Sequence, residues 1–264
     1  MENLKGFLID LDGVMYVGDH LIKGATDALA FLEEQGFKYR FVSNTTRKSR
    51  KTIAERLSSM GLDIPEKYIF TPPLAAIAFM KKTGKRSGQL LVTGDVDRDF
   101  QQANVCEPGE RADFVIVGDA GDKINYESMN MAFRALMEGA ELIALEKDRY
   151  WMAQDGLALS AGPFVSALEY ATGKTAVVVG KPSIDFFRLA LDDMEIRPEQ
   201  AAMMGDDIMT DIGGAQAAGM KGILVRTGKF REDILKKSNV KPDYIIDSIA
   251  GLKNLMQSTS GNWA

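Results

Sequence analysis

The chain has very little cysteine and histidine, and this shortage excludes several kinds of site. Cys106 is the single cysteine, so an internal disulfide cannot form, and the composition is typical of a reducing, cytoplasmic compartment. His20 is the single histidine. One histidine and one cysteine cannot build a zinc site, and a histidine-dependent catalytic triad would rest on His20 alone. We interpret His20 as a surface loop residue.

The chain also lacks an excess of basic residues and a long apolar run. The 32 Lys and Arg residues are outnumbered by 37 Asp and Glu residues, which gives a net charge of −5. This balance argues against binding to a phosphate backbone, so we expect no nucleic-acid partner. No apolar run approaches the roughly 18 residues of a membrane span, so we expect no membrane partner. The N-terminal residues show no signal-peptide pattern, which also favours a cytoplasmic location.

Strand-like and helix-like patterns alternate along the chain. Apolar runs at 7–9, 39–42 and 69–70 are separated by helical patterns at 25–35 and 48–60, and a similar alternation continues to the end of the chain. Such alternation predicts an α/β fold with a parallel sheet and helices on both faces. In these folds, ligands bind beyond the carboxyl ends of the strands.

Two aspartates follow the first apolar run directly. Because side chains repeat every two residues along a strand, Asp10 and Asp12 leave the strand end on the same side. Two such carboxylates repel each other and lose hydration, so we expect a cation there, and Mg²⁺ together with a phosphate is the simplest candidate. A polar turn at Gly13 is the structural alternative. An EF-hand calcium loop is excluded because it needs glycine at its sixth position, and Gly13 would be fourth.

Polar groups also follow three later apolar runs. They are Ser43, Asn44, Lys181, Asp206, Asp207 and Asp211. A lysine, a hydroxyl and amide pair, and several carboxylates at one edge of a sheet would form a site for phosphate and Mg²⁺ on chemical grounds.

Taken singly, these residues also fit structural roles. Ser43 and Asn44 can form a turn, and Lys181 can be a surface residue. Asp207 and Asp211 can start and cap the next helix, and for Asp211 this alternative stays open.

Four motifs in order resemble those of a known family. They are Asp10-Leu11-Asp12-Gly13, Ser43-Asn44, Gly180-Lys181-Pro182 and Gly205-Asp206-Asp207-Ile208-Met209-Thr210-Asp211. They are similar to the motifs of the haloacid dehalogenase (HAD) superfamily, and the match covers essentially the whole chain. Segments at 41–46, 155–159, 162–165 and 168–172 resemble the NagD-like phosphatases. Within these, they are most similar to the branch of HAD-like hydrolase domain-containing protein 2 and phospholysine phosphohistidine inorganic pyrophosphate phosphatase.

The resemblance implies a role for each motif residue. Asp10 would be the nucleophile that forms an aspartyl-phosphate, and Asp12 would protonate the leaving group and then activate water. The Asp10 carboxylate, the Asp12 carbonyl and the Asp206 carboxylate would hold Mg²⁺. Ser43, which replaces the more frequent threonine, would bind the phosphoryl group with Asn44, and Lys181 would hold Asp10 and phosphate together. The residues that would support the metal through its ligands are Asp207, Asp211 and Gly13.

The distance along the chain between Ser43 and Lys181 predicts an inserted domain. Both must meet at one phosphate, yet a strand-helix-strand crossover needs only about 30 residues. We therefore assign 1–76 and 176–264 to the core and 77–175 to the insert. The resemblance implies a Rossmann-like parallel-sheet core with an α/β cap of the C2 type, and a homodimer formed through the cap.

One charged loop of the insert is a candidate specificity element. It comprises Glu146, Lys147, Asp148 and Arg149, after a predicted strand of the insert. NagD is similar here but carries an Asn-Pro-Asp type of loop, and this departure argues against carrying over a nucleotide-sugar or nucleotide substrate. A solvated charged turn is the alternative.

These features predict a Mg²⁺-dependent phosphatase for a small phosphorylated metabolite. Pyrophosphate or a phosphoamino-acid-type bond is suggested by the branch that the chain resembles. Two alternatives stay open: a phosphotransferase or phosphomutase on the same fold, and a catalytically silent module that binds a phosphorylated ligand. The carboxylate of Asp12 favours a phosphatase over a dehalogenase.

Overall fold

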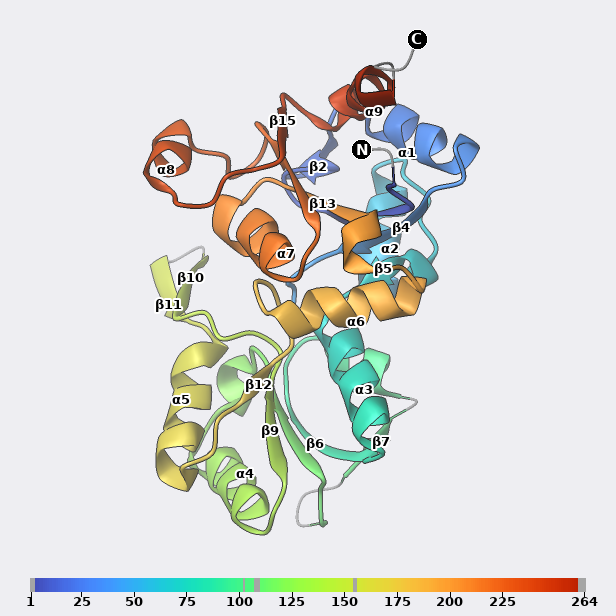
Figure 1. Cartoon of the computed structure of the whole chain (residues 1–264). Helices are drawn as coiled ribbons and strands as arrows, with labels where there is room; N and C mark the ends of the chain where they lie inside the picture. Colours follow the sequence, from blue (N-terminus) through green and yellow to red (C-terminus); the bar gives the residue numbers. More distant parts are fainter. Residues whose placement is uncertain (1–2, 102, 107–109, 154–155, 261–264) are drawn as a thin grey trace. The chain divides into compact units, whose positions relative to one another are not determined.

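The computed structural model describes residues 3–101, 103–106, 110–153 and 156–260 (Figure 1). The chain divides into two compact units. The first comprises Met1–Ser43, Ala54–Phe70 and Lys181–Ala264, and the second comprises Asn44–Ile53 and Thr71–Gly180. Within the described ranges, no helix combines the length and apolar character needed to cross a membrane.

The first unit is built on a six-stranded parallel sheet with the order β15-β14-β13-β1-β4-β5. Its elements are β1 (Gly6–Asp10), β2 (Tyr16–Val17), β3 (His20–Leu21), α1 (Ala25–Glu34), β4 (Lys38–Val42), α2 (Arg50–Ser59, which begins in the second unit), η1 (Glu66–Tyr68), β5 (Ile69–Phe70), α6 (Ile184–Met194), η4 (Pro198–Gln200), β13 (Ala201–Gly205), η5 (Ile208–Gly213), α7 (Gly214–Ala217), β14 (Lys221–Val225), α8 (Glu232–Lys237), β15 (Tyr244–Ile246), η6 (Ile249–Gly251) and α9 (Leu252–Ser260).

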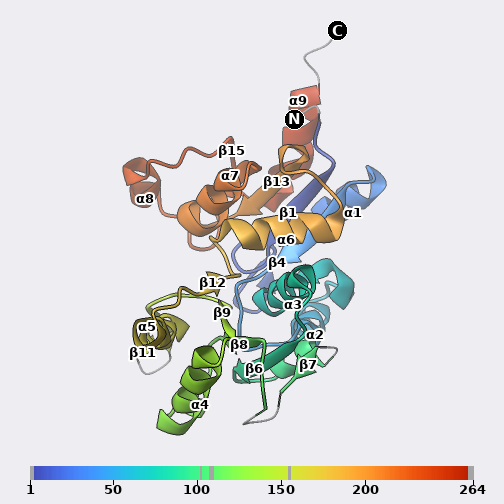
Figure 2. The same cartoon turned by 60° about the horizontal axis from the view of Figure 1, so that its bottom comes forward.

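Helices cover the first sheet because they bury apolar stripes against it. In α6, the stripe includes Phe186 and Phe187, and the Phe186 ring packs edge-on against Phe70 of β5 at 5.5 Å between centroids. The helix begins where the Ser183 side chain accepts a hydrogen bond from the Asp185 main-chain N–H at 3.2 Å. Figures 1 and 2 show α6 beside α7, and α1 near α9 at the other side of the sheet. The predicted parallel α/β architecture is confirmed.

The second unit has its own five-stranded parallel sheet, with the order β12-β9-β8-β6-β7, and a separate antiparallel hairpin, β10-β11. Its elements are α3 (Pro72–Thr83), β6 (Ser87–Leu91), η2 (Val96–Phe100), β7 (Asn104–Val105), β8 (Phe114–Val117), η3 (Gly121–Lys123), α4 (Tyr126–Met137), β9 (Glu141–Ala144), β10 (Tyr150–Ala153), β11 (Gly156–Leu159), α5 (Ala161–Thr172) and β12 (Val177–Val178). Helices α4 and α5 lie side by side, with α3 across the sheet from them (Figures 1 and 2).

The strand that precedes Lys181 differs from the prediction. The sequence assigned residues from 176 onward to the core, but the structure has β12 at Val177–Val178, paired with Ile143 and Ala144 of β9 in the second sheet. A short apolar run fits a buried position in either sheet, and only its partner strand decides between them. The second unit therefore continues to Gly180, beyond the predicted insert of 77–175.

The second unit also includes the turn that leads into α2. The Asp95 carboxylate accepts hydrogen bonds from the main-chain N–H and hydroxyl of Ser49, at 2.9 and 2.7 Å, and from the hydroxyl of Thr52 at 2.6 Å. These bonds hold the pKa of Asp95 at about 2, although burial opposes them. A carboxylate distant in the sequence thus anchors the start of α2.

Candidate active site

Asp10 is the last residue of β1, the strand between β13 and β4. It lies directly opposite Val42, the last residue of β4. All of β1 is buried, and Asp10 itself is 8 % exposed. Burial raises the pKa of Asp10, which shows how costly an uncompensated charge would be at this position. A positive partner is therefore needed beside this carboxylate.

The buried side chain of Lys181 is one such partner. Its Nζ donates to Oδ1 of Asp10 at 2.8 Å and to Oδ1 of Asp211 at 2.6 Å. Burial alone would lower the pKa of Lys181, but the two carboxylates raise it above its usual value. Lys181 thus stays protonated and joins the end of β1 to η5.

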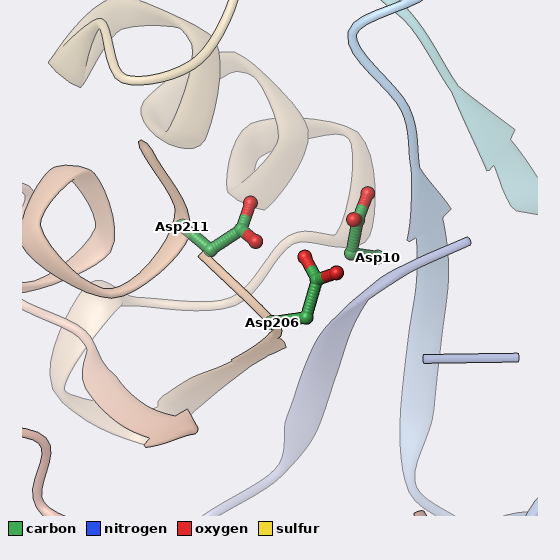
Figure 3. A group of neighbouring side chains, drawn as sticks. All are labelled: Asp10, Asp206 and Asp211. Atoms are coloured by element: carbon green, nitrogen blue, oxygen red, sulfur yellow. The ribbon is translucent and has the colours of Figure 1, made fainter. Parts of the chain in front are cut away.

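Three buried carboxylates face one another at this edge of the sheet: those of Asp10, Asp206 and Asp211 (Figure 3). One oxygen of each lies within 4.8 Å of the others. Asp206 directly follows β13, and Asp211 lies in η5. Burial raises the pKa of Asp206 and brings that of Asp211 to about 6. Oxygen donors that repel one another in this way are suited to a hard cation such as Mg²⁺.

Two other predicted site residues have different surroundings. Asp12 is exposed, whereas Gly13, which follows it, is buried. Asp207 caps η5, because its Oδ1 accepts hydrogen bonds from the main-chain N–H groups of Met209 and Thr210 at 2.8 and 2.9 Å. The capping alternative therefore describes Asp207, whereas the Asp211 carboxylate contacts Lys181.

A loop after β14 makes contacts that the strand pattern did not predict. The Thr227 hydroxyl donates to the carbonyl oxygen of Gly13, and the Lys229 main-chain N–H donates to Oδ2 of Asp206 at 2.6 Å. A Cβ atom on Gly13 would lie 1.9 Å from this oxygen, and one on Gly228 would lie 2.0 Å from it. Both glycines also have positive φ, so a side chain at either position is disfavoured by the backbone conformation as well as by the close contact. The available signal was a Thr-Gly-Lys sequence that begins two residues after the last residue of β14, a strand of the same sheet.

The predicted phosphate-binding pair is divided between the two units. Ser43 follows β4, one residue beyond the position opposite Asp10, and its main-chain N–H donates to the carbonyl oxygen of Phe70 at 3.3 Å. Asn44 belongs to the second unit. A Cβ atom on Gly180, the residue before Lys181 in the chain, would lie 2.9 Å from the Asn44 Oδ1 atom. The unit boundaries thus fall beside the motif residues Ser43 and Lys181.

The candidate cap loop, Glu146 to Arg149, is held in place by other residues of the second unit. Glu146 is 5 % exposed, and its carboxylate accepts hydrogen bonds from the Ser160 hydroxyl at 2.6 Å, from the Ala161 main-chain N–H at 2.8 Å and from the loop itself. Burial raises the pKa of Glu146 despite these bonds. Lys147 forms an ion pair with Glu169 of α5 at 2.7 Å. A solvated turn therefore does not describe Glu146, which anchors the loop to the start of α5; contact with substrate stays a prediction.

Comparison with known proteins places this arrangement among hydrolases. A family model described as haloacid dehalogenase-like hydrolase matches residues 7–105, and one described as HAD-hydrolase-like matches residues 178–252. The chain is 44 % identical over 239 residues to haloacid dehalogenase-like hydrolase domain-containing protein 2 of Homo sapiens, covering 90 % of each chain. It is 39 % identical over 262 residues to the Homo sapiens phospholysine phosphohistidine inorganic pyrophosphate phosphatase, covering 97 % of this chain and 95 % of the relative.

Solved structures agree in fold over nearly the whole length. The p-nitrophenyl phosphatase from Archaeoglobus fulgidus superposes with a TM-score of 0.85 at 31 % identity, covering 96 % of this chain and 99 % of the other. NagD from E. coli superposes with a TM-score of 0.84 at 25 % identity, covering 94 % and 98 %.

Proposed function

We propose, from the premise that this chain belongs to the haloacid dehalogenase-like hydrolase family and is one of its phosphatases, that it is Mg²⁺-dependent and acts through an aspartyl-phosphate on Asp10. The matches to the family models and to the two relatives confirm the family resemblance that the four motifs indicated. The observation that carries the proposal is the buried Asp10 carboxylate at a strand end, 2.8 Å from the Lys181 ammonium.

In the first step, an oxygen of Asp10 attacks the phosphorus of the substrate. The new oxygen–phosphorus bond forms as the bond to the leaving group breaks, and Asp12 donates a proton to the leaving oxygen. Lys181 orients Asp10 and offsets negative charge on the phosphoryl oxygens. Ser43 and Asn44 bind the same oxygens with their hydroxyl and amide groups.

In the second step, water attacks the phosphorus and releases Asp10. Asp12, now a carboxylate, accepts the proton of that water, and the bond between phosphorus and the Asp10 oxygen breaks. Inorganic phosphate leaves, and both aspartates regain their starting forms. The exposure of Asp12 supports this role, because a proton-transfer group must reach both the leaving group and water.

The donor set fits Mg²⁺. The Asp10 and Asp206 carboxylates and the Asp12 carbonyl would hold the ion, and Asp211 would support it through Lys181 and the main chain of Asp207. When bound, Mg²⁺ supplies positive charge that offsets the charges of the carboxylates and the phosphoryl group. Burial raises the pKa of Asp10 and of Asp206, and a cation held between them would offset the cost of burying both charges, which supports this assignment.

We propose a small substrate with a phosphoanhydride, phosphoamide or phosphoester bond. The names of two similar proteins support this range, since one is a phospholysine, phosphohistidine and inorganic pyrophosphate phosphatase and the other a p-nitrophenyl phosphatase. We further propose that the second unit is the cap. The chain first enters the second unit directly after Ser43 and finally leaves it directly before Lys181, and this supports the assignment because both residues would bind the phosphoryl group.

The proposal is tested by phosphate release from p-nitrophenyl phosphate and pyrophosphate. We expect turnover by the wild type with Mg²⁺, loss of turnover with EDTA, and loss in Asp10→Asn. Asp27→Asn, at an exposed position in the first turn of α1, is the matched control and should retain turnover. Unimpaired turnover in Asp10→Asn would contradict the mechanism. If added sugars receive the phosphoryl group in place of water, the enzyme is a phosphotransferase.

A further inference from the structure

The loop after β14 fixes Lys229 beside the candidate site through its main chain. The Lys229 N–H donates to Oδ2 of Asp206 at 2.6 Å, and the Thr227 hydroxyl donates to the carbonyl oxygen of Gly13. Gly228, between them, packs so closely that an added Cβ atom would lie 2.4 Å from the Gly13 Cα atom. The backbone of Lys229 therefore cannot move away from Asp206 without breaking these contacts.

The Lys229 side chain differs from the other cations of this loop. Arg226 pairs with Glu232 at 3.3 Å, and Arg231 pairs with Asp233 at 3.2 Å. Lys229 is exposed, and among the residues that the structure describes no carboxylate pairs with its Nζ atom. Its positive charge is thus available to a ligand.

Lys229 lies beside the cluster of buried carboxylates. Its main-chain nitrogen is 2.6 Å from Oδ2 of Asp206, and an oxygen of Asp206 lies within 4.8 Å of one oxygen of Asp10 and one of Asp211. Lys229 and Asp206 also line a small cavity of about 190 Å³ together with residues of η5 and α8, and the lining of this cavity does not include Asp10 or Lys181. The first unit thus offers two cations near these carboxylates. Lys181 is buried and already bound by the carboxylates of Asp10 and Asp211, whereas Lys229 is exposed and forms no such ion pair among the described residues.

We propose that Lys229 is a substrate-binding residue that pairs with a second anionic group of the substrate, beyond the phosphoryl group that is transferred. This inference rests on the proposed phosphatase function and adds a preference to it. A substrate with a charged leaving group, such as pyrophosphate, gains an ion pair at Lys229, whereas an uncharged leaving group does not. The main-chain N–H of Lys229 holds Asp206 whatever the side chain is.

The test compares two substrates in matched variants. Lys229→Met removes the charge and keeps the length of the side chain and the main-chain donor, and Lys229→Arg keeps the charge. Lys237→Met, on the exposed end of α8, controls for the change in net charge. At fixed free Mg²⁺, we expect Lys229→Met to lower kcat/KM for pyrophosphate about tenfold, mainly through KM, and to change that for p-nitrophenyl phosphate less than about twofold. Lys229→Arg should recover most of the loss.

Salt provides a second readout. The KM for pyrophosphate should rise more steeply with ionic strength in the wild type than in Lys229→Met, because salt screens an exposed ion pair. Equal losses for both substrates would show that the Lys229 charge acts on the carboxylates of the site and not on a second anionic group of the substrate. That result would overturn the inference, and so would unchanged kinetics. Failure of the proposed function is distinguishable, because the wild type would then lack Mg²⁺-dependent and Asp10-dependent turnover of p-nitrophenyl phosphate.

Discussion

Replacing Lys181 with methionine should destabilise the first unit strongly. The side chains of Lys181, Asp10 and Asp211 are 4 %, 12 % and 1 % exposed, so the substitution leaves two buried carboxylates without their shared cation. Removing one partner of a buried ion pair costs about 3–5 kcal/mol. Protonation of Asp211 relieves part of this cost, because its pKa is already raised to about 6 by burial. We therefore expect a loss of about 3 kcal/mol at pH 7.

The sign of the pH dependence follows from the same carboxylate. Without Lys181, the pKa of Asp211 in the folded protein rises further above its ordinary value of 3.8. The folded variant then binds more protons than the unfolded chain, so its stability falls as pH rises. The deficit relative to the wild type should grow from pH 5 to pH 8, and Asp211→Asn in the Lys181→Met background should reduce it.

Hydrogen exchange at the β1 and β13 amides, in metal-free buffer, measures this loss of stability within the first structural unit. The control is Lys221→Met, which removes a lysine that pairs with Asp243 at the same distance of 2.8 Å but is 54 % exposed. We expect that control to cost less than about 1 kcal/mol. A loss in Lys181→Met no larger than in the control, at pH 7, would refute the buried-cluster reasoning.

Two further predictions concern single contacts. Gly228→Ala should abolish turnover and weaken Mg²⁺ binding, because its Cβ would lie 2.0 Å from Oδ2 of Asp206, whereas Gly18→Ala, with a similar positive φ but open space around it, should leave both unchanged; equal effects on turnover would contradict this. Asp95→Asn should destabilise the second unit by about 1 kcal/mol at pH 7, because hydrogen bonds to a charged acceptor at the start of α2 are weakened. The pKa of Asp95 falls from 3.8 to about 2 on folding, so its contribution is present above the first value and is lost as pH falls toward the second. The Tm of wild type and that of Asp95→Asn, measured by thermal unfolding at a series of pH values, should therefore converge as pH falls through this range. A difference in Tm that stays constant with pH would contradict the assignment.

The strand ends were predictable because buried parallel strands must place their last residues at one edge. Asp10 and Asp206 follow apolar runs of adjacent strands, and the register of β1 with β13 brings both to the same edge. Lys181 was predicted at the same site, and its Nζ is 2.8 Å from Asp10, although β12 before it belongs to the other sheet. The motif order carried that information, and the apolar pattern did not.

The contacts that the sequence did not predict depend on the tertiary packing of short polar segments. The approach of Gly13 to Gly228 needs two turns from distant parts of the chain, and neither glycine differs in sequence from one that makes an ordinary turn. Glu146 lies in a charged segment, yet it is buried because the start of α5 supplies its hydrogen-bond donors. Burial of a charged residue follows from its partners and cannot be inferred from local composition.

The formation of an aspartyl-phosphate on Asp10 is the central claim, and trapping it is the most direct measurement. In Asp12→Asn, the group that activates water is absent, so the intermediate should accumulate after addition of p-nitrophenyl phosphate and Mg²⁺. Acid quenching and peptide mass spectrometry should find the mass of one phosphoryl group on the peptide that contains Asp10, labile to hydroxylamine. Absence of that adduct in Asp12→Asn, while the wild type turns over the same substrate, would contradict the mechanism.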